Sequence, residues 1–317
     1  MTAPVTAPPA GGRFSTRGWI LFAVMSVLWG MPYLFIKEAV ETISPAGVVA
    51  GRTLAAALLL LPFALRAKAM RPAFAKIGWV LAFGAVEMAG PFFLLSHAEL
   101  TLSSGLTGLL VATVPLFAAV IAVVGGDRAV LRPSRILGLV IGFVGVGVIV
   151  AGPAISEGDV AAGLVAVGEV LLVAVLYATA PFIVAHKLRD VPPLGTITVS
   201  LLVVGLCYLP VALIVQPAPP SARSLWALGL LAVLCTALAF IAFFALIREV
   251  GPARAPLFTY VNPVVAILLG VIVLSEPLTV GLLLGFPLVI LGCWLAATGG
   301  TLRLRRPAVD PPPVAPG

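Results

Sequence analysis

The sequence predicts an all-α integral membrane protein whose ten transmembrane helices form two inverted repeats of five helices each. Three observations predict this fold. Of the 317 residues, 61% are hydrophobic and only 10% are charged, whereas about 25% of an ordinary soluble domain is charged. The apolar residues fall into ten runs, each close to the ~20 residues that a helix needs to cross a bilayer. The second half of the chain also repeats the first at an offset of 148 residues or one fewer.

The apolar runs are expected to be helices because lipid offers no partner for a free backbone amide or carbonyl. The alternation that is typical of membrane β-strands is absent. The first run is too long for a secretory leader and leads directly into another run. The predicted helices cover residues 18–36, 47–65, 77–97, 102–124, 134–152, 161–185, 194–215, 224–247, 254–275 and 278–298.

These helices divide the chain into four predicted parts. Residues 17–152 form the first five-helix repeat, and residues 161–299 form the second. The segment 1–16 is rich in Pro, Ala and Gly, and the segment 303–317 is rich in Pro. Such composition is typical of disordered chain, so both are expected to be disordered tails.

Lysine and arginine predict the orientation in the membrane. If the N-terminus is cytoplasmic, sixteen of the 19 Lys and Arg residues lie in cytoplasmic segments, and only Lys37 and Arg223 lie in outer ones. Arg52 is the remaining one and lies inside a span. Cytoplasmic loops carry an excess of positive charge, so both termini are predicted to face the cytoplasm, with the protein in the cell membrane. The net charge of +7 is explained in this way, and no basic patch indicates nucleic-acid binding.

The internal repeat is carried by residue types that rarely coincide in apolar sequence. Residues 28–62 align without a gap with residues 176–210. Because each repeat has an odd number of helices, the second copy would enter the membrane from the opposite side, as in many alternating-access carriers. The matched positions include Pro45 and Pro193, Gly47 and Gly195, Pro62 and Pro210, and Pro115 and Pro263.

The first predicted helix contains Gly30 and Pro32, and the matching sixth helix contains Pro181. Carriers of this kind often border the substrate site with helices that Gly or Pro interrupts. A tolerated kink is the alternative, because both residues are common in membrane helices. The G-x-x-x-G spacings, such as Gly138 to Gly142, favour close helix packing instead.

Several stretches resemble the EamA family of the drug/metabolite transporter superfamily. They are the Trp-Gly of the first helix, the run SPAGVVAGRTLAAALLL, and the run YVNPVVAILLGVIVLSEPLTVGLLLGFPLVILG. The resemblance covers about residues 18–298. It implies ten helices in inverted repeats, cytoplasmic termini and the carriage of small metabolites, frequently outward. The halves have diverged, since Ser200 stands opposite Arg52 and Asp127-Arg128-Ala129 only loosely matches Glu276-Pro277-Leu278.

Three charged residues inside predicted helices are candidate transport residues, because a charge in a span is costly. Glu87 lies near the middle of its helix, where a carboxyl can exchange protons or bind a substrate amine. A structural hydrogen bond is the alternative. Glu169 and Arg52 lie in the outer halves of theirs. Glu169 could instead lie at the lipid headgroups. Arg52 can bind a carboxylate, pair with either glutamate, or extend to the surface.

Polar and aromatic side chains complete the predicted site. Asn262 precedes a proline that frees a backbone carbonyl. Trp29 and Tyr177 lie some way from the predicted helix ends, although an interfacial belt is the alternative for the aromatic candidates. His97 could titrate near neutral pH, but His97 and Glu99 at outer helix ends are more simply explained as solvated. The further predicted site residues are Trp29, Tyr33, Tyr177, Tyr260, Asn262 and His97.

These features predict a secondary transporter that works by alternating access. The family resemblance implies outward carriage of small polar or amphiphilic metabolites, such as amino acids or nucleobases. No phosphate-binding loop or hydrolase motif is present, so no cofactor is expected, and the cysteines show no metal spacing. The expected partners are the substrate, the bilayer and, as a further candidate, protons. An integral-membrane enzyme acting on lipid and a passive channel are the alternatives.

Overall fold

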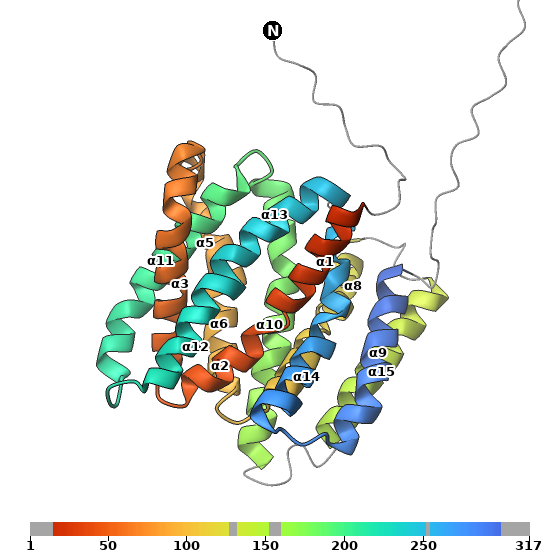
Figure 1. The fold of residues 1–317 in the computed structure, drawn as a ribbon. Helices are drawn as coiled ribbons and strands as arrows, with labels where there is room; N and C mark the ends of the chain where they lie inside the picture. Colours follow the sequence, from red (N-terminus) through yellow and green to blue (C-terminus); the bar gives the residue numbers. More distant parts are fainter. Residues whose placement is uncertain (1–14, 127–131, 152–159, 252–253, 299–317) are drawn as a thin grey trace, which may run out of the picture.

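A computed structural model describes residues 15–126, 132–151, 160–251 and 254–298 (Figure 1). The predicted tails fall almost wholly outside these residues, as does the segment compared above with Glu276-Pro277-Leu278.

The described residues are helical throughout, with short connections and no strand. The first half holds α1 (Thr16–Leu28), α2 (Pro32–Val40), α3 (Pro45–Arg66), α4 (Met70–Ala75), α5 (Ile77–Gly84), a π-helical segment (Ala85–Ala89), α6 (Gly90–Ala98), α7 (Ser104–Val111), α8 (Val114–Val124) and α9 (Pro133–Ala151). The second half holds α10 (Val160–Lys187), α11 (Pro193–Val215), α12 (Ala222–Ala232), a second π-helical segment (Val233–Leu238), α13 (Ala239–Val250), a 3₁₀ turn (Ala255–Tyr260), α14 (Asn262–Leu274) and α15 (Val280–Thr298).

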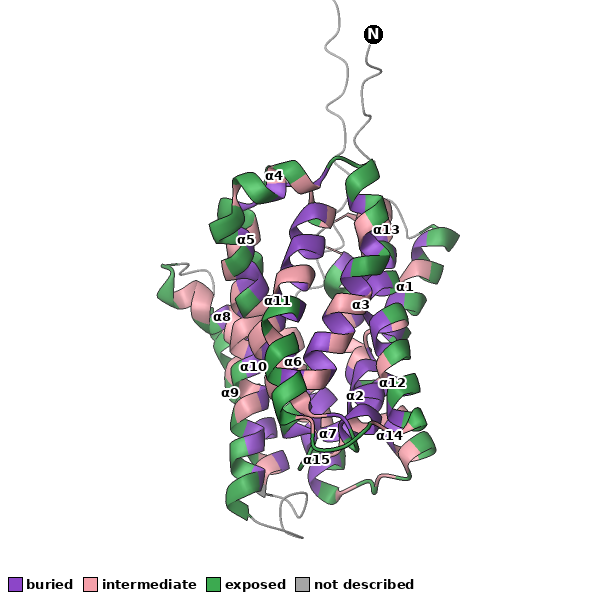
Figure 2. Cartoon of the chain, turned by 90° about the vertical axis from the view of Figure 1, so that its left-hand side faces the viewer, coloured by how far each residue is buried: buried purple, intermediate pink, exposed green. Residues whose placement is uncertain are grey.

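These elements combine into ten spans that are long and apolar enough to cross a membrane, within the part of the chain described. The outer faces of the bundle are themselves apolar. Leu213, Ile214 and Ile272 expose 75%, 83% and 73% of their surface, which lipid rather than water accommodates. The buried residues lie on the faces that the helices turn toward one another (Figure 2). The predicted all-α membrane fold with ten spans is confirmed.

The first span is interrupted where the sequence places Gly30 and Pro32. α1 ends at Leu28, α2 begins at Pro32, and a Cβ on Gly30 would come within 2.5 Å of the Cβ of Val265 in α14. A glycine is needed here because the two helices approach so closely. The sixth span differs from this pattern. α10 runs without a break through Pro181, whose ring lies on an exposed face.

α3 and α11 occupy matching places in the two repeats and pack along their whole length in opposite directions. The amide of Ser44, before α3, donates to Gln216 Oε1, after α11, at 3.0 Å. At the other end, Gly195 of α11 lies against the backbone of Ala69, which follows α3. An antiparallel pair agrees with inverted repeats, although the inversion of the complete repeats stays a prediction.

α9 and α15, the last helices of the two repeats, pack closely through glycines. A Cβ on Gly292 would clash with the backbone of Gly142, and one on Gly138 with the backbone nitrogen of Ala296. Small residues allow such backbone approach between membrane helices. The G-x-x-x-G spacing in α9 therefore serves packing.

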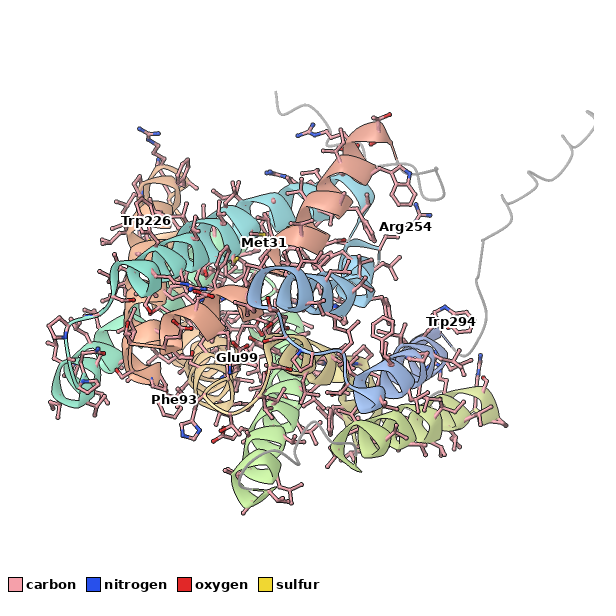
Figure 3. All side chains as sticks on the ribbon, turned by 60° about the horizontal axis from the view of Figure 1, so that its bottom comes forward. Met31, Phe93, Glu99, Trp226, Arg254 and Trp294 are labelled. Atoms are coloured by element: carbon pink, nitrogen blue, oxygen red, sulfur yellow. The ribbon has the colours of Figure 1, made fainter. Side chains whose placement is uncertain are left out.

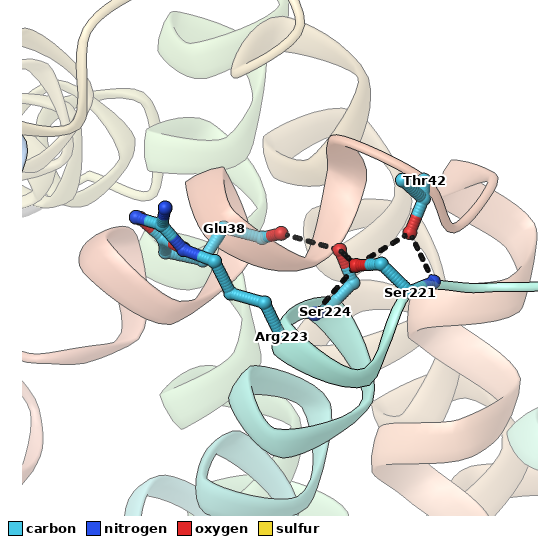
Figure 4. A network of polar contacts seen from close by, with 5 residues as sticks. All are labelled: Glu38, Thr42, Ser221, Arg223 and Ser224. Carbon is cyan, nitrogen blue, oxygen red and sulfur yellow. Dashed lines mark hydrogen bonds and ion pairs between the residues drawn. The ribbon is translucent and has the colours of Figure 1, made fainter.

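A polar network joins α2 to the start of α12 (Figure 4). Arg223 forms an ion pair with the carboxylate of Glu38, and Ser224 Oγ donates to the main-chain oxygen of Glu38 at 2.9 Å. The amide of Ser221 donates to Thr42 Oγ1 at 2.9 Å. These contacts fix one end of the bundle across the two halves of the sequence.

Candidate functional site

A cavity of about 240 Å³ lies inside the bundle between the two halves of the chain. Helices from both halves contribute to its wall, including α2, α3, α10 and α14. Seven of the nine predicted site residues line it, namely Trp29, Tyr33, Arg52, Glu87, Tyr177, Tyr260 and Asn262. The tertiary structure therefore brings together residues that lie up to 233 positions apart in the sequence.

The cavity wall repeats the internal symmetry of the sequence. Many residues that line the cavity have a counterpart 148 residues further along the chain that also lines it. The pairs are Trp29 and Tyr177, Glu87 and Cys235, Phe92 and Phe240, Val111 and Thr259, Ala112 and Tyr260, Val114 and Asn262, and Pro115 and Pro263. The cavity thus lies where the two repeats meet, and its polar groups differ between them.

Two matching π-helical segments bring side chains to this wall. Residues 85–89 and 233–238 correspond at the same offset, and they carry Glu87 and Cys235. In the second segment Thr236 Oγ1 donates to the main-chain oxygen of Leu231, five residues earlier, at 3.0 Å. π-Helical turns of this kind occur frequently at functional sites, where they redirect side chains.

Arg52 lies in the wall with its guanidinium held in place on two sides. Its Nε donates to Thr236 Oγ1 at 2.9 Å, and its central carbon lies 3.7 Å from the centre of the Phe92 ring. The side chain is buried, yet it makes no ion pair with any residue that the structure describes. The remaining guanidinium nitrogens are therefore available to an anionic group in the cavity.

Glu87 brings a carboxyl group to the same cavity. Its carboxylate makes no hydrogen bond or ion pair with any described residue. The predicted alternative, a structural hydrogen bond to a neighbouring helix, is thus not formed. Tyr177 lies within electrostatic range of both Glu87 and Arg52. An acid and a guanidinium that are both unpaired, in a cavity that aromatic side chains also line, suit a small molecule with an ammonium and a carboxylate group.

Aromatic rings form an apolar part of the wall. The indole of Trp29 lies 5.0 Å from the ring of Phe243, 5.3 Å from Phe258 and 5.8 Å from Phe240. Trp29 is therefore fixed inside the bundle rather than in an interfacial belt. Its position at the break between α1 and α2 explains how it reaches the cavity.

Asn262 combines a place in the cavity wall with a structural contact. With its amide nitrogen turned toward them, it donates to the main-chain oxygens of Phe258 at 3.1 Å and Ser26 at 3.2 Å. The side chain thereby ties the start of α14 to α1. The amide oxygen of the side chain is then the atom that can contact a substrate.

Glu169 and His97 do not reach the cavity. Instead, the Nδ1 atom of His97 lies 2.9 Å from the carboxylate of Glu169, which joins α6 to α10 at the surface of the bundle. The side chain of His97 is 48% exposed. Glu169 consequently does not pair with Arg52, a pair that the sequence alone left open.

Sequence reasoning missed several polar and aromatic residues of the site. Cys235, Phe240 and Thr259 stand one repeat after lining residues of the first half, so the offset of 148 was a signal that could have found them. Glu99 was also misjudged. We expected it to be solvated at a helix end, but its side chain is completely buried.

Three comparisons with known proteins bear on this site. The sequence profile of the EamA-like transporter family matches residues 16–151 and 164–298. The chain is 29% identical over 297 residues to "uncharacterized inner membrane transporter YedA" of Escherichia coli K12, covering 92% of this chain and 94% of that protein. An "uncharacterized transporter" of Archaeoglobus fulgidus is 25% identical, with 88% and 98% covered.

The fold is similar to that of a protein of known crystal structure, with a TM-score of 0.62, 18% identity, and coverage of 88% of this chain and 96% of that one. Among the described residues, no group of three or more His, Cys, Asp or Glu side chains could hold a metal ion.

The two family matches together span most of the chain and both halves of the cavity wall. The chain therefore belongs to the EamA-like transporter family and is a membrane transporter.

Proposed function

We propose that the protein is a secondary carrier for small zwitterionic metabolites, amino acids above all, and that it exports them by alternating access. The observation that carries this proposal is the presence of Glu87 and Arg52, each without an ion-pair partner among the described residues, in one aromatic cavity. Glu87 would bind the ammonium group, Arg52 would bind the carboxylate, and the aromatic rings would accept the side chain of the cargo.

The size of the cavity supports a small cargo. Pockets for drug-sized ligands measure about 300–1,000 Å³, and this cavity is smaller, at about 240 Å³. A single amino acid suits it better than a lipid or a large drug. A nucleobase would fit by size, but it offers no pair of opposite charges for Glu87 and Arg52.

The mechanism that we propose follows from the cavity wall, to which both repeats contribute. The cavity lies where the repeats meet, so a rocking motion of one repeat against the other would open it to each side in turn. The outward direction rests on the family resemblance. The cell membrane and cytoplasmic termini rest on the charge asymmetry of the sequence and on the relative described as an inner membrane transporter.

The test is untargeted profiling of the medium of cells that overproduce the protein. We expect amino acids to accumulate outside cells with the unaltered protein and not outside cells with Glu87→Gln at equal expression. Glu169→Gln is the matched control, because it removes an acid of a span that does not line the cavity. Equal export by all three proteins would refute the role of Glu87.

Two further results would refute the carrier itself. A change in membrane lipids without any change in the medium would favour a lipid-modifying enzyme. Transport in proteoliposomes that neither saturates nor shows counterflow would favour a passive channel. Export of nucleobases rather than amino acids would leave the carrier intact and replace the zwitterion hypothesis.

A further inference from the structure

Glu99 is a buried acid at the end of the bundle that holds the α6–α7 turn, residues 99–103. In Figure 3 it lies near the middle of this end, which faces the viewer. Its exposed fraction is 0%, and both carboxyl oxygens lack a hydrogen-bond partner among the described residues. Buried polar groups are almost always paired, so an unpaired buried acid needs an explanation.

The nearest charged groups are already engaged with other partners. Lys37 of α2 donates from Nζ to the main-chain oxygens of Glu99 and Leu102, at 2.6 and 2.9 Å, and not to the Glu99 carboxyl. Glu276, after α14, accepts from the amide of Ser104 at 2.7 Å and from its hydroxyl at 3.0 Å. Lys37 thus holds the α6–α7 turn against α2, and Glu276 holds the start of α7.

Glu99 also lies close to the cavity. Tyr33 and Arg52, which both line the cavity, interact with Glu99 electrostatically. Leu95, one helical turn before Glu99, also lines the cavity, so Glu99 lies between the cavity wall and the end of the bundle. An acid in this place can respond both to the cargo and to the opening of that end.

The physical state of Glu99 follows from these contacts. An ionised carboxylate without hydrogen bonds is strongly disfavoured in a buried site. Burial raises the pKa of Glu99 well above its usual range; Lys37 and, more weakly, Arg52 oppose this effect, and Glu276 adds to it. The neutral acid fits the observed site, because it needs no counter-charge.

We propose that Glu99 is a proton-binding site of the carrier, and that the bound proton holds this end of the bundle closed. The inference deepens the proposed function and rests on it, since only a carrier must close one end of its cavity. When the α6–α7 turn loosens, the Glu99 carboxyl meets water and releases its proton to it. The resulting carboxylate lies beside Lys37, whose ammonium then has a stronger partner than two carbonyl oxygens.

The sign of the pH effect follows from linkage. The closed arrangement binds the proton more tightly than the open one, because only the closed arrangement keeps Glu99 from water. Acid therefore favours closure, and closure is lost as the pH rises through the raised pKa of Glu99 in the closed state. Replacing Glu99 with glutamine, which resembles the neutral acid, should keep the end closed at every pH.

The first experiment measures how readily the turn opens in the purified full-length protein. In a background that carries Cys207→Ser and Cys235→Ser, a cysteine is introduced either at Leu102, which is 2% exposed, or at Leu100 in the same turn, which is 51% exposed. A water-soluble maleimide then reports the rate of modification over a range of pH. The rate at position 100 corrects for the ionisation of the thiol itself.

We expect the ratio of the two rates, position 102 over position 100, to rise about tenfold or more from acidic to alkaline pH, and to stay flat and low with Glu99→Gln. A ratio that is flat in both backgrounds, or that rises equally in both, would overturn the proposal. This outcome would leave the proposed export function intact, because the export assay depends on the cavity and not on this turn.

A second measurement observes the proton directly and does not depend on the cysteine variants. Infrared difference spectra should show a protonated carboxyl band at neutral pH that is lost in Glu99→Gln and kept in both Glu276→Gln and Glu87→Gln. If the band is the same in Glu99→Gln, Glu99 is ionised and the proposal fails. If sodium chloride abolishes the band and potassium chloride does not, the site binds a metal cation, and the proton assignment is overturned.

Discussion

Glu87 and Cys235 are 148 residues apart, yet they occupy matching π-helical segments and line the same cavity. One repeat thus presents a carboxylate where the other presents a small, weakly polar thiol. Arg52 and Ser200 differ in the same way, since Arg52 lines the cavity, whereas Ser200 donates to the main-chain oxygen of Val80 at 3.1 Å. The charges of the site come from the first repeat alone, and the cavity is asymmetric although its backbone is duplicated.

Replacement of Glu87 should change which cargo is carried. With Glu87→Gln we expect transport of free amino acids to fall at least about tenfold, which corresponds to ~1.4 kcal/mol of lost transition-state stabilisation. N-acetyl amino acids lack the ammonium group, so their transport should fall much less. Uptake by proteoliposomes of paired free and acetylated amino acids provides the measurement, and equal losses for both would contradict the assignment.

Replacement of Arg52 should have the complementary effect. Arg52→Lys keeps the positive charge but cannot make the planar two-point contact with a carboxylate. We expect the KM for amino acids to rise about tenfold, while that for the matching decarboxylated amines stays within about twofold. Thr236→Val, which removes the hydrogen bond to Arg52 Nε, should act in the same direction but more weakly. A larger loss for the amines would show that Arg52 is needed only for structure.

The packing of α9 against α15 should depend on Gly292 and not on Gly147. A Cβ on Gly292 would clash with the backbone of Gly142, whereas one on Gly147, also in α9, would meet no atom within 4 Å. We expect Gly292→Ala to destabilise the protein by about 1–3 kcal/mol through overpacking. Gly147→Ala should be neutral or slightly stabilising, because alanine favours the helix. Thermal unfolding in detergent compares the two, and similar midpoints would contradict this account.

The ion pair between Glu38 and Arg223 should contribute little to stability. The side chain of Arg223 is 66% exposed, although that of Glu38 is only 9% exposed, and solvent screening weakens an ion pair that water reaches. We expect a double-mutant cycle with Glu38→Gln and Arg223→Gln to give a small coupling energy that falls as salt is added. A coupling energy that is larger and insensitive to salt would show that the pair is shielded from solvent.

Residues of the site could be predicted from sequence only where the position of a residue along its span determines whether that residue is buried. Glu87 and Arg52 were identified because a charge inside an apolar run must find a polar environment. Glu169 satisfied the same criterion, yet it pairs with His97 at the surface. A hydropathy pattern gives the depth of a residue along its helix, but not which neighbour the side chain meets.

Glu99 shows the same limit outside the spans. Its place between two apolar runs indicated a solvated side chain, whereas Glu99 is buried and Lys37 Nζ donates to its main-chain oxygen. That outcome depends on side chains of α2 and of the α14–α15 connection, more than sixty and more than 170 residues away. No local pattern carries such information.

The ten helical spans were determined by the sequence alone, because backbone groups in lipid must bond within their own helix. The internal repeat was also visible in the sequence, whereas a break at Gly30 was one of two possibilities that the sequence left open. Only the tertiary structure decided which polar side chains share the cavity, which meet at the surface, and which acid is buried without a partner. The physical reason is that helix formation is local, whereas the surroundings of a buried charge are set by several helices that pack together from distant parts of the chain.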